Sequence, residues 1–349
     1  MARDETAYLA YAIWEASHVD FLHDRGQPKE DTMAHEVETM MYAGATPWHG
    51  LGTKLEGQSL TDIGQVLKAA GLDWQVEKVK MVTADTGQHI PNKHATRRMS
   101  DGSILGVVGD RYTVLQNNEA MGWFDPWLQG GQAVMETAGS LGEGSRVFML
   151  ARLNLEPIEI APDDAVEKYI LLSHSHDGSL SLRVGFTPIR VVCNNTLALA
   201  HKDHASSLIR IKHSRSIHEN LSNIQEVMNL ADQQFEATAV QYRRLQQTSV
   251  NRNDIAKYLK AVMSVGKDES VTSGKMANIL TDIWGFIEGG RGNDRPGVRG
   301  TAWGMYNGMN EWLNYGRGSS SETRLSSLWY GPNAKVNDKA LACALELCA

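Results

Sequence analysis

The chain has 349 residues, of which 42% are hydrophobic and 21% are charged, and its formal net charge at pH 7 is −7. Length and composition are typical of a globular protein with about two domains, and the acidic balance argues against a protein that coats nucleic acid with its whole surface. We find no run of about 18 apolar residues that could cross a membrane. Acidic residues stand where an export signal would be basic, so we expect a cytoplasmic protein.

Residues 1–32 predict an N-terminal extension, because a short helical stretch is followed by a polar linker, GQPKEDT. A segment rich in glycine and aromatic residues then leads to a helix that Ser59 or Thr61 can cap. That helix should end at Ala70, since Gly71 suits the left-handed position that follows a helix. The folded core is therefore expected to begin after the extension.

Alternating apolar residues predict several strands in the next part of the chain. LDWQVEKVKMVT is one strand, a polar connection follows it, and SILGVVGDRYTVLQN has the pattern of a hairpin that turns at Gly109-Asp110. We expect a helix capped by Asn118 and bent by Pro126. AVMETAGSLGEG and SRVFMLARLNL then predict two strands joined at residues 142–144.

The stretch over residues 168–196 predicts the hairpin around which the domain is organised. Asp177-Gly178 suits a two-residue type I′ turn, which would place Leu172 opposite Arg183. Because side chains alternate between the faces of a strand, one face should be core and the other open to solvent. The expected core face carries Tyr169, Leu171, Leu180, Leu182, Val184 and Phe186. The expected open face carries His174, His176, Ser179, Ser181 and Arg183.

Helical patterns dominate the remainder of the chain. Apolar residues recur at helical spacing from Ser216 to Gln247 and predict one long helix, and further helices are expected after it. We therefore predict an α+β fold, in which an antiparallel sheet with hairpins packs on a long helix and a mostly helical C-terminal region follows. The expected divisions are the extension, an α+β core domain over residues 33–250 and a helical region over residues 251–349.

Positive charge is concentrated in one part of this acidic chain. Between Lys168 and His218 there are seven Lys and Arg residues against two acidic residues, a local charge of +5. Such an island is typical of a surface that binds anions. The alternative is that these charges are scattered over a solvated sheet and helix.

Histidines in the same region allow a second interpretation. His174 and His176 share one strand face, and His201 and His204 could complete a metal site if their helix folded over the hairpin. The alternative is that the histidines are partly exposed strand residues. We find no GxxxxGK[ST], GxSxG, HExxH or CxxC motif, so no catalytic residue, bound metal or cofactor is assigned.

Seven stretches together resemble the phage/plasmid-like protein family of unknown function. They are MAHEVETM, PWHGLGT, GLDWQVE, LGVVGDRYTVLQNNEA, ETAGSL, TPIRVVCNNTL and GTAWGMYNGMNEW. The resemblance covers the chain from Met33 almost to its C-terminus and implies a protein of the bacterial host cytoplasm encoded by a mobile element. The expected order of strands, hairpin and long helix is also similar to that of ring-forming single-strand annealing proteins of phages, an analogy of topology.

The basic island and the family resemblance together predict a protein that binds single-stranded DNA, promotes strand annealing or recombination and forms a homo-oligomer. The residues expected to contact DNA are Arg183, Arg190, Lys202, Arg210, Lys212, His174 and His176. Two alternatives remain. The four histidines could hold a metal that activates water on a phosphodiester or nucleotide, or the acidic remainder could engage a host or phage protein.

Overall fold

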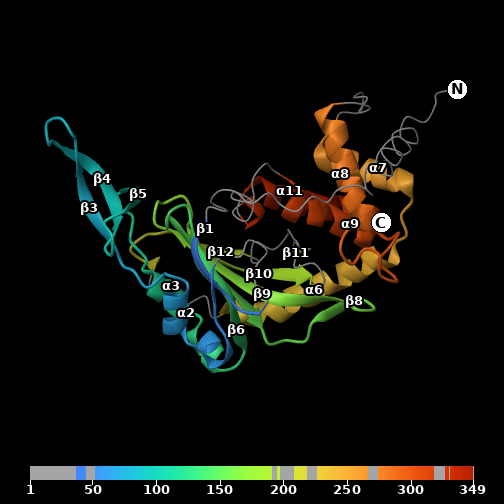
Figure 1. Ribbon diagram of the computed structural model, residues 1–349, viewed down its shortest axis with the longest axis horizontal. Coiled ribbons are helices and arrows are strands. Elements are labelled where there is room, and N and C mark those ends of the chain that lie inside the picture. Colours follow the sequence, from blue (N-terminus) through green and yellow to red (C-terminus); the bar gives the residue numbers. More distant parts are fainter. Residues whose placement is uncertain are drawn as a thin grey trace.

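A computed structural model describes the chain over residues 37–44, 52–190, 195–196, 208–217, 226–265, 274–317, 327–329 and 331–348. It has two β-sheets and a helical C-terminal region, so the predicted α+β class is confirmed. A large sheet occupies the middle of the molecule, a small sheet projects from one end of it, and the C-terminal helices gather at the other end (Figure 1). No helix of the described residues combines the length and apolar character needed to span a membrane.

The large sheet has nine strands among the described residues, in the order β11-β10-β9-β7-β6-β1-β2, with β12 paired to β10 and β8 paired to β9. All of its pairs are antiparallel except β1 with β2. The bounds are β1 (Val37–Tyr42), β2 (Thr53–Lys54), β6 (Ala133–Leu141), β7 (Arg146–Leu153), β8 (Ile158–Ala161), β9 (Asp164–Ser175), β10 (Leu182–Arg190), β11 (Asn195–Thr196) and β12 (Leu208–Ile211).

The small sheet, which we call the arm, has the order β3-β4-β5 and is fully antiparallel. Its strands are β3 (Val76–Val82), β4 (His89–Arg98) and β5 (Ile104–Gly109). The prediction missed β4, whose sequence HIPNKHATRR looks like a polar connection because most of its side chains are not buried. The predicted hairpin turn at Gly109-Asp110 is wrong, because β5 pairs back with β4 and the chain leaves the arm after Gly109.

Short helices precede and follow the arm in the chain and pack mainly on β1 and β6 of the large sheet, and longer helices form the C-terminal region. Their bounds are a 3₁₀-helix (Gly57–Thr61), α2 (Ile63–Ala69), α3 (Asn117–Gly122), α4 (Asp125–Gln129), α6 (Glu226–Gln247), α7 (Arg252–Met263), α8 (Lys275–Gly289), α9 (Ala302–Glu311), a π-helical turn (Trp312–Gly316) and α11 (Pro332–Glu346). Asp62 caps α2 in place of the predicted Ser59 or Thr61, while Gly71 has the expected positive φ of 64°.

The large sheet carries apolar side chains on both faces. Ile170, Leu172 and Val184 belong to the main hydrophobic core, which also includes Phe186 against Phe235 of α6 at a ring-centroid distance of 5.6 Å. The opposite face has a second, smaller cluster made of Leu141, Phe148, Leu150, Tyr169 and Leu171. The expected division into one core face and one open polar face is therefore wrong, although packing against the long helix is confirmed.

The central hairpin differs from its predicted register by one residue. Arg183 pairs with Ser173, whereas a two-residue turn would have placed it opposite Leu172. The reason lies in the loop: the Ser175 hydroxyl donates to the Leu180 carbonyl and accepts from the Leu180 N–H, which closes a longer connection than type I′. Since alternation has a period of two residues, this slip changes which side chains of β10 share a face with those of β9.

Candidate nucleic-acid interface

The arm is fixed to the end of the large sheet by close contacts. The Thr96 hydroxyl of β4 donates to the His176 carbonyl at 2.8 Å, and the Tyr112 hydroxyl donates to the Ser175 carbonyl at 2.6 Å. Gly106 of β5 lies directly against Asp177, because a Cβ atom at Gly106 would be 2.4 Å from the Asp177 Cα. The arm and the hairpin loop are therefore held in a defined relation.

A buried arginine reinforces the same junction. Arg98 is 7% exposed and donates to both carboxylate oxygens of Glu38, at 2.7 and 3.0 Å, and to the Glu143 carbonyl at 2.8 Å. Its guanidinium also lies 4.7 Å from the ring centroid of Trp74. This two-oxygen ion pair compensates the burial of the charge and ties the arm to β1 and to the turn between β6 and β7.

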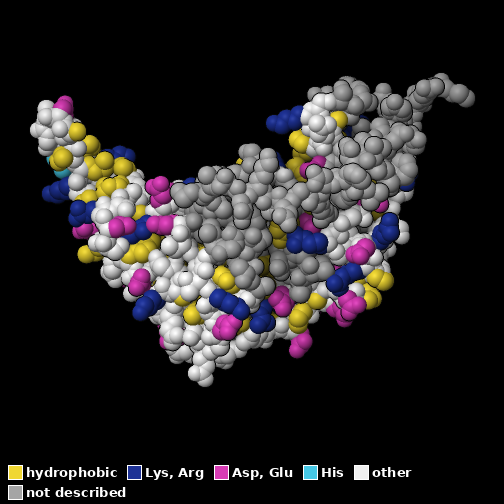
Figure 2. Space-filling model, in the orientation of Figure 1, with side chains coloured by type: hydrophobic (Ala, Val, Ile, Leu, Met, Phe, Trp, Pro, Cys, Tyr) yellow, Lys and Arg dark blue, Asp and Glu magenta, His cyan; other side chains and the backbone are white. Residues whose placement is uncertain are grey.

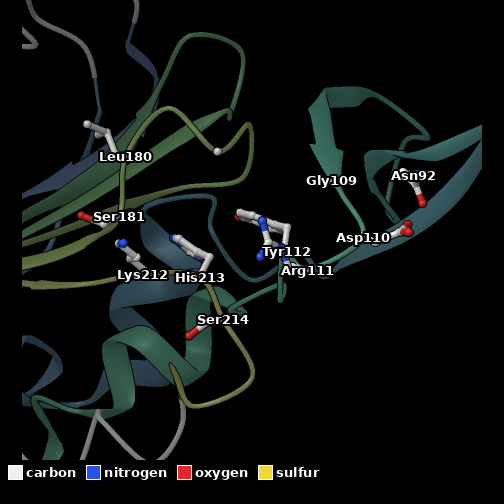
Figure 3. Close-up of a pocket in the computed structure, with 11 residues that line it drawn as sticks. Asn92, Gly109, Asp110, Arg111, Tyr112, Leu180, Ser181, Lys212, His213 and Ser214 are labelled. Atoms are coloured by element: carbon white, nitrogen blue, oxygen red, sulfur yellow. The ribbon is translucent and has the colours of Figure 1, made fainter.

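A groove opens where the arm meets the large sheet, and its volume is about 840 Å³. The arm and the segment that follows it contribute Asp110, Arg111 and Tyr112 (Figure 3). The large sheet and the turn after β12 contribute Ser181, Lys212 and His213 from the other side. The groove thus joins two segments that lie about a hundred residues apart in the sequence.

Two stacked rings form part of the groove wall. Tyr112 and His213 have ring centroids 4.8 Å apart and an interplanar angle of 14°. Burial raises the pKa of Tyr112, so its hydroxyl stays protonated and keeps donating to Ser175. The Tyr112 hydroxyl fixes the ring pair to the end of β9, and both residues line the cavity.

A short row of cations leads away from the groove. Arg183 of β10 stands directly opposite Arg210 of β12, and Lys212 follows Arg210 by two residues, so it lies on the same side of the chain. Arg210, Lys212 and Arg111 are exposed, and Arg183 is half-buried. Arg210 and Lys212 are therefore the members of the row that an anion can reach from solvent.

Comparison with known protein families classifies the chain. A protein-family profile described as a domain of unknown function, DUF932, matches residues 104–329, which is more than half of the chain. The chain belongs to the DUF932 family. The match includes β5, the whole central hairpin and both sides of the groove. No curated protein and no solved structure matches this DUF932 chain. The expectation of a family of unknown function is confirmed, while an origin in phages or plasmids stays a prediction.

The seven residues predicted to contact DNA do not all lie on one surface of the DUF932 chain. The fold brings Arg183, Arg210 and Lys212 together in the row beside the groove. The side chain of Arg190 and the whole of Lys202 lie outside the described residues. His174 and His176 are both 0% exposed, so the expectation of an open face with two imidazoles is wrong. They are buried because the arm and α3 cover the end of the hairpin, a contact between distant segments.

The buried histidines form a row with His213. The His174 ring contacts the ring of His176 at 4.9 Å and that of His213 at 6.0 Å. Burial lowers the pKa of His176 to about 3 and holds the pKa of His174 well below its ordinary range. The Nε2 atom of His176 lies 3.0 Å from Oδ1 of Asn117. These two imidazoles are therefore neutral core groups at physiological pH.

The alternative metal site finds no support in this row. Within the part of the chain that the structure describes, no three His, Cys, Asp or Glu residues are arranged to hold a metal ion. His201 and His204, which the metal interpretation required, lie outside the described residues.

Sequence reasoning missed three groove residues, Arg111, Tyr112 and His213. Arg111 and Tyr112 were assigned to a hairpin, and His213 follows a short strand without any motif around it. The one signal that could have indicated them was the basic island, which contains Lys212 and His213 but does not reach Arg111.

Proposed function

We propose that this chain binds single-stranded DNA in the groove between the arm and the large sheet. The observation that carries the proposal is that cations and aromatic rings share one open cavity. Arg111 and Lys212 come from opposite walls, and the stacked rings of Tyr112 and His213 line the same space. Proteins that hold single strands combine a cationic groove for phosphates with aromatic side chains on which bases stack.

The cation row gives the phosphate backbone a path out of the groove. Lys212 belongs both to the groove and to the row with Arg210 and Arg183. A strand that leaves the cavity along β12 would place successive phosphates beside the exposed side chains of Lys212 and Arg210. Each charge-assisted contact contributes about 1.5–3 kcal/mol when well formed, and less where solvent screens it.

The shape of the site favours a single strand over a duplex. Tyr112 and His213 lie in a concavity between two protein walls, where a base can contact their rings only if it is unpaired. The groove volume of about 840 Å³ lies within the range of ligand cavities, about 300–1,000 Å³, so it accommodates a short segment of a strand.

The proposal extends to the biological setting. The resemblance to phage and plasmid proteins supports a role in strand annealing or recombination of a mobile element in the host cytoplasm. Hydrophobic side chains gather on the arm (Figure 2), and four of them are at least half exposed: Val82, Met99, Ile104 and Val107. Exposed apolar groups of this kind support contact with a second copy of the chain, as expected of a homo-oligomer.

Binding of a fluorescent oligo-dT strand, followed by anisotropy at several salt concentrations, tests this function. We expect Arg111→Ala and Lys212→Ala each to weaken binding about tenfold. The double variant should lower the slope of log K against log salt by about 1.4, because each phosphate contact on a single strand contributes about 0.7 to that slope. The matched controls are Arg299→Ala and Lys257→Ala, which remove exposed cations elsewhere and should leave both quantities unchanged. Absence of binding at low salt would refute the proposal.

The two alternatives remain predictions, and no contact among the described residues favours either of them. Metal analysis of untagged protein addresses the hydrolase, and a host-lysate pull-down addresses a protein partner.

A further inference from the structure

His213 occupies an unusual place in the groove wall. Its Nδ1 atom lies 3.3 Å from the Thr113 carbonyl, and a carbonyl can only accept a hydrogen bond, so Nδ1 carries the proton in the neutral ring. The Nε2 atom is buried and makes no hydrogen bond to the described residues. The backbone of Leu180, like that of Thr113, raises the pKa of His213.

The surroundings of His213 oppose a second proton at Nε2. Burial lowers the pKa of His213, and the backbone groups of Thr113 and Leu180 offset only part of that effect. The neighbouring titratable and charged groups are of both signs: Arg111, Lys212, His174, His176, Asp110, Asp177 and Tyr112. Asp110 is in turn paired with His94 at 3.1 Å. The ring is thus neutral, although its backbone contacts suit the cation.

We propose that an anion enters this groove together with one proton, which His213 takes up at Nε2. This inference rests on the proposed function and names the ligand chemistry of the same site, a phosphodiester anion. A negative charge near the ring favours the imidazolium, and by linkage the protonated ring then raises the affinity for the anion by the same factor. The proton comes from solvent, no bond of the ligand is broken, and the ring acts by charge from the wall of the cavity.

The other two histidines of the row do not share this role. His174 and His176 are completely buried, and neither lines the groove. His176 also lies near the Arg98 guanidinium, which disfavours a second positive charge there. Proton uptake on anion binding is therefore confined to His213 among these three residues.

The effect has a defined sign and size. The affinity increases as the pH falls, because the protonated form binds better, and one coupled proton gives at most about a tenfold change in Kd per pH unit. We expect the change between about pH 8 and pH 5.5, the interval around the ordinary histidine pKa. Thymine and the phosphodiester group do not titrate in this interval, so an oligo-dT probe adds no pH dependence.

The experiment measures the Kd of a fluorescent oligo-dT of about 15 nucleotides across that interval at constant ionic strength. Wild type should bind at least about tenfold more tightly at the acidic end, and His213→Gln should bind with a much flatter profile. His89→Gln, which changes an exposed histidine of the arm, is the matched control and should keep the wild-type profile. Calorimetry in two buffers of different ionisation enthalpy should show uptake of about one proton by wild type and none by His213→Gln.

The failures of the two proposals are distinguishable. If no oligonucleotide binds at any pH, the proposed function is wrong. If oligo-dT binds but wild type takes up no proton, or His213→Gln retains the full pH profile, the function stands and the role of His213 is overturned. Should His213→Gln not fold, absence of proton uptake by wild type would still overturn the role of His213.

Discussion

Replacing Gly106 by alanine should loosen the joint between the arm and the large sheet. A Cβ atom at this position would lie 2.4 Å from the Cα and 2.5 Å from the Cβ of Asp177, distances that real contacts do not show, and the first of these atoms is backbone. Forcing extra volume into a packed site costs about 1–3 kcal/mol. For a chain of 349 residues, that corresponds to a fall in the unfolding midpoint of about 1–4 °C, since the unfolding entropy is about 2.1 cal/mol/K per residue. Affinity for oligo-dT should fall as well, because the same contact shapes the groove.

Gly109→Ala is the matched control, since it makes the same change on the same strand. No atom lies within 4 Å of a Cβ at Gly109, and its φ is not in the left-handed region. This substitution should leave the midpoint unchanged or raise it slightly, through the lower entropy of the unfolded chain. Differential scanning calorimetry compares the two variants with wild type. Equal midpoints for Gly106→Ala and Gly109→Ala would refute the close docking of the arm.

Three further outcomes follow from the structure. Arg98→Met should lower the unfolding free energy by about 2–3 kcal/mol, which is less than for a fully buried pair because Glu38 is partly exposed. Denaturant unfolding of this variant, compared with that of Glu38→Gln, would show whether the unpaired carboxylate accounts for the loss. The contribution of His174 and His176 to the unfolding free energy should be complete above about pH 6.5 and fall as the pH drops towards 3. Both residues have lowered pKa values in the folded chain, so the unfolded chain binds the extra protons. An unfolding midpoint that is unchanged at pH 5 would contradict their burial. Asn251→Ala should cost about 1 kcal/mol in thermal unfolding, since this residue caps α7 through the N–H groups of its first turn.

Local patterns were sufficient for the parts of the fold that depend on near neighbours. The hairpin of β6 and β7 turns at residues 142–144 as expected, and Gly142 and Gly144 supply two of its three positive φ values, the third being that of Glu143. The C-terminal helices also follow their apolar spacing, although α11 begins earlier than the sequence ALACALEL indicates. These elements are specified by residues close to one another in the chain.

Features that depend on distant contacts could not be predicted. The Ser175 hydroxyl closes the loop to Leu180 and shifts the hairpin register, which no dipeptide preference reveals. β1 joins the sheet beside β6, about a hundred residues away. The histidines of β9 look like surface groups in sequence, and only the docked arm buries them. Arg210 and Lys212 are exposed, as predicted. Arg111, which faces Lys212 across the groove, was not predicted as a contact residue because the arm brings it there from a distant part of the chain.

The central claim concerns where the strand lies, and photo-crosslinking tests it most directly. Oligo-dT that carries 5-iodouracil reacts with aromatic side chains on which its bases stack, and mass spectrometry then identifies the modified peptide. We expect the crosslink at Tyr112, with loss of the product in the Arg111→Ala, Lys212→Ala double variant. Crosslinks confined to aromatic residues outside the groove, such as Trp329 or Tyr315, would contradict the assignment of this groove as the DNA site.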